Sequence, residues 1–301
     1  PAVITFIKTA FSEFTPTESE YSKVLASSSD HRSSGMRKNK AKERFNKLVD
    51  EQLYGSGEEE PEPPELTYQS LLSFAKEYWT PENLIISVVS PEPPESVNRL
   101  FAGFGNSAAQ DTEPASEEFY RLNSEPVTIE EDGGGAQSYL FWGFVKRIDP
   151  GDKPALTALS LLLSDKIVFD IREKQGLAYR IQAGITVKKD KALFAVKFGT
   201  RPENVDTLKP QFPKLFTMEM LSDVDEATFE KSINMYLGRM MFRRLSSINQ
   251  AYYLGHSQYF EDNMLADGEF LDRLKSVTMD DVYRVADKYM DRKNPVLICV
   301  R

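Results

Sequence analysis

Three residues in the stretch IREKQGLAYRI, residues 171–181, have types and spacing suited to binding negative charge. Arg172 carries a guanidinium with five N–H donors, and Tyr179 carries a phenol that can donate a hydrogen bond. Donors held in fixed positions near a reacting carbonyl stabilise an oxyanion. Gly176 has no Cβ and lets the backbone turn sharply at a helix end. The spacing predicts that Arg172 ends a helix and that Tyr179, on the next strand, comes to the same side.

A plain structural interpretation stays open for the same residues. Arg172 and Lys174 would then complement the negative end of a helix dipole. Tyr179 would be a strand residue whose ring packs in the core. The two interpretations differ in where the side chains of Arg172 and Tyr179 lie.

The elements around this stretch predict an α+β domain over residues 127–301. Its apolar patterns predict strands at 138–145, 176–187, 192–200 and 296–300, and helices at 153–174 and within 205–291. The domain would contain about 175 residues, which is an ordinary domain size.

The sequence also repeats itself. Residues 66–89, LTYQSLLSFAKEYWTPENLIISVV, align without gaps on residues 277–300, VTMDDVYRVADKYMDRKNPVLICV, so that Thr67 falls on Thr278 at an offset of 211. Both copies predict an N-capping threonine, an amphipathic helix, a turn and a buried strand. A duplicated domain is the simplest explanation.

A weaker match supports the duplication, because FTPTESEYSK (14–23) resembles LSDVDEATFEKS (221–232) at an offset of 208. We therefore expect a first domain at 1–105, a linker at 106–126 and a complete second domain at 127–301. By this repeat the first copy would begin about 84 residues before Pro1, so the first domain is expected to be truncated. The elements of the first domain that correspond to strand 138–145 and helix 153–174 would lie outside this chain.

Composition sets limits on the class of protein. The chain has 301 residues, of which 41% are hydrophobic and 28% charged, and its net charge is −9. These values are typical of a globular protein, and no basic stripe suggests a nucleic-acid partner. No apolar run approaches the ~20 residues of a membrane span. The single cysteine, Cys299, lies in an apolar strand and is expected to be a buried thiol.

The chain resembles the C-terminal half of M16 zinc metallopeptidases, the group of pitrilysin, insulinase and mitochondrial processing peptidase. The resemblance rests first on IREKQGLAYRI, which is similar to the family's Arg-x-x-x-x-Gly-Leu-x-Tyr segment. It continues through three further stretches, at 200–212, 222–240 and 274–290, and the first domain matches at 66–91. One departure is LLLSDKIVFD, residues 161–170, which lacks the glycines that the family usually carries there.

The resemblance implies duplicated M16-type α+β domains, each with a mostly antiparallel sheet covered by helices. Two such halves close around an unfolded peptide. It also implies that Arg172 and Tyr179 face the catalytic zinc across the chamber, bind the substrate backbone and stabilise the oxyanion. Gly176 would be the turn that positions them.

The family's zinc motif, His-x-x-Glu-His, does not occur in this sequence. The two histidines, His31 and His256, have no such context, and catalytic zinc takes three protein ligands. We therefore expect no complete catalytic site and no metal ligands in this chain, which alone would be inactive. The zinc of the complete enzyme would belong to upstream sequence or to a partner chain that carries the motif.

The resemblance leaves two functions open. The chain is either the noncatalytic portion of a zinc metallopeptidase, which closes the chamber and binds an extended peptide, or a non-proteolytic structural and interaction subunit of the same fold. Family habit suggests a bacterial protein in the periplasm, although the cytoplasm also fits one unpaired cysteine.

Overall fold

The computed structural model describes residues 2–12, 15–33, 39–54, 66–104 and 120–301. By its contacts the chain forms two compact units, and each is described by itself. The first unit consists of residues 1–37, 60–116 and 243–267, and the second consists of residues 38–59, 117–242 and 268–301. The predicted linker at 106–126 lies partly outside the described residues.

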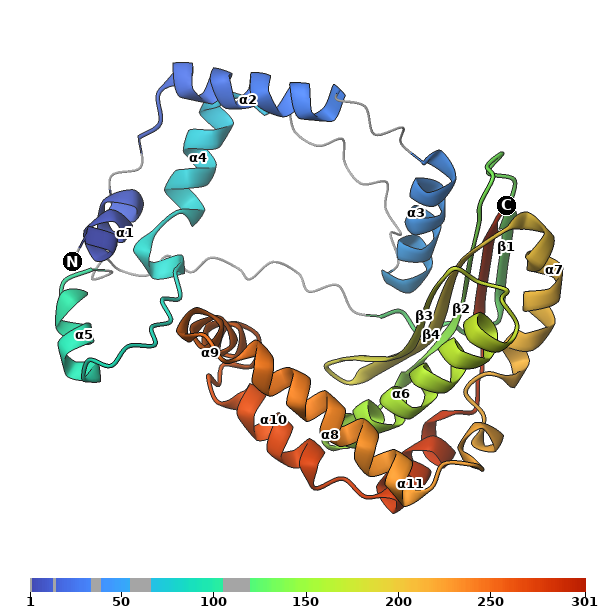
Figure 1. Ribbon diagram of the computed structural model, residues 1–301. Coiled ribbons are helices and arrows are strands. Elements are labelled where there is room, and N and C mark those ends of the chain that lie inside the picture. Colours follow the sequence, from blue (N-terminus) through green and yellow to red (C-terminus); the bar gives the residue numbers. More distant parts are fainter. Residues whose placement is uncertain (1, 13–14, 34–38, 55–65, 105–119) are drawn as a thin grey trace. The chain divides into compact units, whose positions relative to one another are not determined.

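The second unit is built on one five-stranded sheet in the order β1-β5-β2-β4-β3 (Figure 1). The strands are β1 (Val127–Glu131), β2 (Ser138–Arg147), β3 (Arg180–Lys188), β4 (Lys191–Thr200) and β5 (Val296–Val300). Only the β1–β5 pair is parallel, and the other neighbours are antiparallel. The α+β class and the mostly antiparallel sheet covered by helices are therefore confirmed.

One face of the sheet packs against helices to form the larger core. β2 and β4 alternate along their length, so that Trp142, Phe144 and Phe194 point into this core. Leu156 and Leu163 of α6 and Val282 of α11 lie against them, fully buried. The helices of this unit are α3 (Lys40–Tyr54), α6 (Lys153–Val168), α7 (Val205–Leu208), α8 (Glu226–Arg243), α10 (Ala266–Lys275) and α11 (Met279–Tyr289).

Helix α3 covers the opposite face over β1, β5 and β2 (Figure 1). Its buried side chains Phe45 and Leu48 form a second core with Phe141 and Ile298. The Arg44 guanidinium also forms two hydrogen bonds with the Glu131 carboxylate. By its contacts α3 thus belongs with the sheet of the second unit, although the predicted boundaries place residues 40–54 in the first domain. The division at 1–105, 106–126 and 127–301 stays a prediction.

The first unit contains only helices among its described elements. They are α1 (Ala2–Ser12), α2 (Glu18–Ser33), α4 (Tyr68–Tyr78), α5 (Pro94–Leu100) and α9 (Ser247–Glu261). Short 3-10 turns occur at Pro81–Asn83 here and at Pro150–Asp152, Pro202–Asn204, Lys209–Lys214 and Met218–Leu221 in the second unit.

The helices reproduce the repeat found in the sequence. α4 and α11 both span eleven residues at the offset of 211, and each begins with a capping box, at Thr67 and at Thr278. α2 and α8 begin at the offset of 208, and the residues before them, Thr17 and Asp225, accept hydrogen bonds from the first turn. Local capping signals in the sequence therefore fixed the helix starts in both copies.

The predicted buried strand at 84–89 is wrong for the described structure. β5, its counterpart in the repeat, pairs on both sides with β1 and β2. Residues 84–89 pair with no strand in the part of the chain that is described, and Ile85 and Val88 are 46% and 47% exposed. An apolar segment becomes a buried strand only where partner strands are present to bond its backbone.

Candidate functional site

The candidate site begins at the C-terminal end of helix α6. After Val168 the helix continues as a π-helical turn, Phe169–Lys174, and Gly176 follows with φ +64°. π-Turns inside helices occur frequently at functional sites. The Gly176 N–H donates to the carbonyl of Arg172 at 3.2 Å, and the Leu177 N–H donates to Ile171 at 3.1 Å. The predicted sharp turn at Gly176 therefore exists, directly hydrogen-bonded to Arg172.

Glycine is needed at this turn for its backbone angle. A Cβ built on Gly176 would meet no atom within 4 Å, so space does not restrict the residue there. A positive φ, however, puts the Cβ of any other L-residue close to its own backbone. The left-handed conformation therefore explains why the sequence places a glycine between Arg172 and Tyr179.

Hydrogen bonds to the end of β4 hold the segment after the turn. The carbonyl of Leu177 accepts from Asn204 Nδ2 at 3.0 Å and from the Thr200 hydroxyl. The Tyr179 N–H donates to the carbonyl of Gly199 at 3.3 Å. Ala178, between the two, is buried. The backbone that carries Tyr179 is therefore fixed, while its side chain points outward.

Tyr179 is 84% exposed, so its ring does not pack in the core. The plain structural interpretation of this residue is therefore wrong. Across the described ranges the phenol has no hydrogen-bond partner. An exposed, unpaired tyrosine on a fixed backbone is available to a ligand.

Arg172 lies on the π-turn with 49% of its side chain exposed. Its Nε donates to Glu173 Oε1 at 2.8 Å, and this carboxylate competes with a ligand for the guanidinium. Lys174 is engaged elsewhere, because it pairs with Asp170 at 2.7 Å and lies over the ring of Phe169. Both cations of this turn are thus exposed and paired with a nearby carboxylate, and Arg172 differs in having a guanidinium whose remaining N–H donors can meet a ligand.

Sequence reasoning missed the residues that support this site. Gln175 and Gln211 exchange two amide hydrogen bonds, at 3.2 and 2.8 Å, and so tie the turn to the 3-10 segment 209–214. Asn204 and Thr200 both donate hydrogen bonds to the carbonyl of Leu177. The stretch 200–212 had signalled the family resemblance, but nothing in its spacing indicated contact with the turn at Gly176.

The described residues do not fit the zinc site that the resemblance implies. His31 falls in α2, and His256 lies on α9 with its ring 5.7 Å from that of Tyr252 and 4.6 Å from that of Phe260. Within the described ranges, no three His, Cys, Asp or Glu side chains gather closely enough to hold a metal ion. None of the helices described is long and apolar enough to cross a bilayer.

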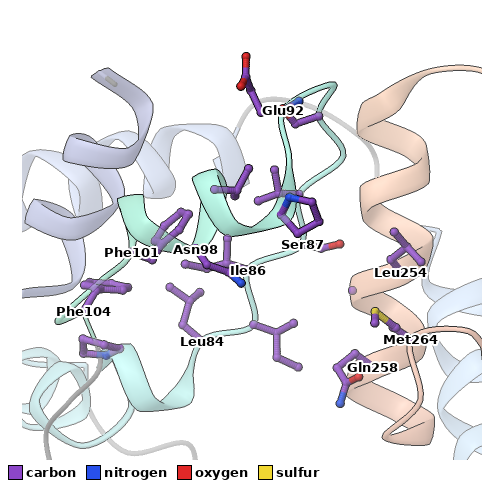
Figure 2. A pocket seen from close by; sticks show the side chains of 17 residues that line it. Leu84, Ile86, Ser87, Glu92, Asn98, Phe101, Phe104, Leu254, Gln258 and Met264 are labelled. Carbon is purple, nitrogen blue, oxygen red and sulfur yellow. The ribbon is translucent and has the colours of Figure 1, made fainter.

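A concave feature lies within the first unit, away from the turn at Gly176 in sequence. A pocket of about 550 Å³ lies between residues 84–104 and α9 with the turn that follows it (Figure 2). Its labelled apolar lining consists of Leu84, Ile86, Phe101, Phe104, Leu254 and Met264. Glu92 is the one ionisable side chain among the residues that line it. Because a catalytic pocket needs several convergent polar groups, this pocket is a poorer candidate site than the turn at Gly176.

Several solved structures share this fold. A peptidase M16 inactive domain from Pseudomonas fluorescens matches with a TM-score of 0.71 and 18% identity, over 99% of this chain and 74% of that one. The periplasmic protease PqqL from Escherichia coli matches with a TM-score of 0.59 and 15% identity, over 70% of this chain and 24% of that one. This chain therefore corresponds to about a quarter of the PqqL chain. At these identities the likeness shows the fold alone.

The ferredoxin protease FusC, solved in complex with Arabidopsis ferredoxin, matches with a TM-score of 0.64 and 12% identity, over 85% of this chain and 29% of that one. A search of curated proteins finds no match. The sequence profile of the family described as "Peptidase M16 inactive domain" matches residues 65–236, which is more than half of the chain and includes the turn at Gly176. The chain therefore belongs to the M16 peptidase family, as a noncatalytic portion of the inactive-domain type.

Proposed function

We propose that this chain is the noncatalytic portion of an M16 zinc metallopeptidase that closes the peptide chamber and binds an extended peptide through Arg172 and Tyr179. The catalytic zinc and its general base belong to a half that carries His-x-x-Glu-His, either in the same polypeptide or in a partner subunit. The single observation that carries this proposal is the exposure of Tyr179, 84% of which is open to solvent on a backbone bonded to β4.

The chemistry of the two side chains suits this role. A guanidinium and a phenol both donate hydrogen bonds, and both can donate to a substrate carbonyl or to an oxyanion. Fixed donors that meet a developing oxyanion contribute typically 10²–10³-fold to kcat. The hydrogen bonds at Gly176, Leu177 and Tyr179 supply the fixed backbone that such donors require.

The test is a pair of variants in the reconstituted peptidase. Arg172→Ala and Tyr179→Phe should each lower kcat for peptide cleavage by about 10²-fold, with a smaller change in KM. Lys174→Ala is the matched control, because it removes a cation from the same turn that is already paired with Asp170. A wild-type cleavage rate in the double variant would show that the assigned role is wrong.

A second candidate is a non-proteolytic structural subunit of the same fold. It is favoured by the exposed apolar side chains along α9, where Ile248, Tyr252 and Tyr259 are all accessible. Such side chains on one helix are typical of contact surfaces for other proteins. This candidate predicts that no extended peptide binds, even when the zinc-bearing half is present.

A further inference from the structure

The face of β3 and β4 opposite the helices carries side chains that the proposed function has not used. β3 alternates, and Ile181, Ala183 and Ile185 pack toward the helical core. The residues between them therefore belong to the other face, and Arg180 and Gln182 are both exposed there. In the register of the sheet, Gln182 lies opposite Lys197, and Arg180 lies opposite Gly199.

These donors lie within reach of one another. Side chains directly opposite on paired strands are about 5 Å apart at Cβ, and diagonal neighbours are about 7–8 Å apart. Arg180 and Lys197 are diagonal neighbours across Gln182 and Gly199. Because Gly199 has no side chain, nothing on β4 covers Arg180 from the opposite position. The long side chains of Arg180 and Lys197 can therefore reach a common anion.

Neither cation is neutralised by an ion pair. In the part of the chain that the structure describes, no carboxylate lies within 4.0 Å of the Lys197 ammonium or of the Arg180 guanidinium. Lys197 is half-buried, and its ammonium lies 5.9 Å from the centre of the Phe141 ring. This burial lowers the pKa of Lys197, which Asp50 of α3 partly counteracts. The charge of Lys197 is therefore incompletely compensated.

The neighbouring side chains add neutral hydrogen-bonding groups. Asn39 Nδ2 donates to the Tyr139 hydroxyl at 2.8 Å, and this hydroxyl donates to Gln137 Oε1 at 2.9 Å. The Gln137 amide nitrogen lies against Gly199, since a Cβ built there would be 3.2 Å from it. These three residues place neutral hydrogen-bonding groups, and no negative charge, beside Arg180.

The start of β3 leaves this face accessible at Arg180 and Gln182, which are exposed. Helix α3 packs mainly on β5 and β2, and its Tyr54 reaches β3 only at the far end of the strand, where Lys188 lies over the Tyr54 ring. β3 is the last strand of the sheet and pairs only with β4 among the described strands. An extended peptide can lie along such an edge, with alternate side chains over the face. Tyr179 and its turn directly precede Arg180, so one peptide can reach both places.

We propose that the face formed by Arg180, Gln182 and Lys197 binds aspartate or glutamate side chains of an extended peptide. This inference rests on the proposed function and specifies its substrate class, which is acidic peptides. The argument is local charge complementarity, because Arg180 and Lys197 lie on one face of the sheet and neither has an ion pair within the described residues. Side chains at alternate positions of an extended peptide lie on one face, so glutamates placed at alternate positions can all meet this face.

The test compares two matched peptides in a binding assay with the full chain. Both are fluorescein-labelled, unstructured, 15 residues long and amidated at the C-terminus, and they differ only in having glutamate or glutamine at alternate positions. EDTA prevents hydrolysis, and fluorescence anisotropy gives the dissociation constants. The glutamate peptide should bind about tenfold more tightly, and the difference should disappear at high salt.

Substitutions then show which residues cause the preference for the glutamate peptide. Arg180→Gln and Lys197→Met should each reduce the preference for glutamate severalfold and leave binding of the glutamine peptide unchanged. Arg180→Glu should reverse the preference toward a lysine-substituted peptide. Arg180 is exposed, so its variants should fold even if Lys197→Met does not. Lys293→Gln is the control, because it removes an exposed cation from the turn that precedes β5, and it should keep the full preference.

The outcomes separate this inference from the proposed function. Equal affinity of the two peptides for the wild-type chain, or a preference that survives Arg180→Gln and Arg180→Glu, would overturn the inference alone. A gain in affinity from a free C-terminal carboxylate, without a gain from glutamate, would also overturn it. Failure of both peptides to bind would overturn the inference and the proposed function together. Arg172→Ala should weaken both peptides equally.

Discussion

Asp152 joins the start of α6 to α11, and its replacement by asparagine is a sensitive test of how the helical layer is held. The carboxylate is buried and accepts hydrogen bonds from the Tyr289 hydroxyl at 2.7 Å, from Arg284 at 2.7 Å and from Lys288 at 3.0 Å. Tyr289 itself accepts from the backbone N–H of Asp149 at 3.0 Å. The substitution keeps the shape of the side chain and removes its charge.

The expected loss follows from these contacts. A hydrogen bond from Tyr289 to a buried charged acceptor contributes about 1.5–3 kcal/mol. The Arg284 and Lys288 side chains are half exposed, so each ion pair contributes at most about 1 kcal/mol. Asparagine keeps one acceptor but turns an amide N–H₂ toward donors. We therefore expect Asp152→Asn to lower the free energy of unfolding by about 2–3 kcal/mol at pH 7.

The loss should depend on pH in a defined direction. Burial alone would raise the pKa of Asp152, but the hydrogen bonds from Tyr289, Arg284 and Lys288 outweigh it and lower the pKa. A lowered folded-state pKa stabilises the protein above the unfolded value of about 3.9, and this stabilisation is lost as pH falls through the folded value. The difference between wild type and Asp152→Asn should therefore be full at pH 7 and shrink below about pH 4.

The assay is urea unfolding followed by the fluorescence of Trp142, which is buried in the core of the second unit. A Trp79→Phe background removes the other tryptophan, which lies in the first unit, so the signal reports the second unit alone. Asp190→Asn is the matched control, because the Asp190–Arg147 pair is exposed and should contribute less than about 1 kcal/mol.

Two results would refute the reasoning about Asp152. One is a loss no larger than that of Asp190→Asn at pH 7, which would mean that the hydrogen bonds from α11 do not stabilise the fold. The other is a difference that stays constant between pH 7 and pH 3, which would mean that the charge of Asp152 is not responsible.

Three further predictions use the same unfolding assay or a simple chemical probe. Gly176→Ala should cost about 1–2 kcal/mol through its positive φ, and Gly176→Asn should cost less, because asparagine tolerates that conformation; equal losses would contradict this explanation. Gly143→Ala should cost about 1–3 kcal/mol, because its Cβ would lie 2.6 Å from the carbonyl oxygen of Phe194 and push β2 from β4; an unchanged urea midpoint would show that the strands can separate freely. The Cys299 thiol is fully buried, and burial raises its pKa. It should therefore react with a disulfide reagent only when the protein unfolds. Rapid reaction of the native protein would contradict this.

Local signals in the sequence were sufficient for many elements. The capping threonines Thr67 and Thr278 marked the starts of α4 and α11, because a side chain that bonds the first turn acts within four residues. The nearly continuous apolar runs of β2 and β4 predicted strands close to the observed bounds. The turn at Gly176 was also predictable, since a positive φ is a property of one residue.

Pairing and packing between distant segments depended on the tertiary structure. Residues 84–89 have the same apolar pattern as β5, yet only β5 finds partner strands among the described residues. The amphipathic pattern of α3 shows that one face is buried, but a pattern cannot specify which sheet it packs on.

In the candidate site, too, some features follow from the local sequence and others from the tertiary structure. The sequence by itself determined the types of Arg172, Gly176 and Tyr179 and the bend between them, because these depend on covalent structure and neighbouring residues. The tertiary structure decided that Tyr179 faces solvent and that Arg180 and Lys197 share one face, because exposure and register follow from the pairing of β3 with β4. A shift of one residue in that pairing would turn these side chains to the opposite face.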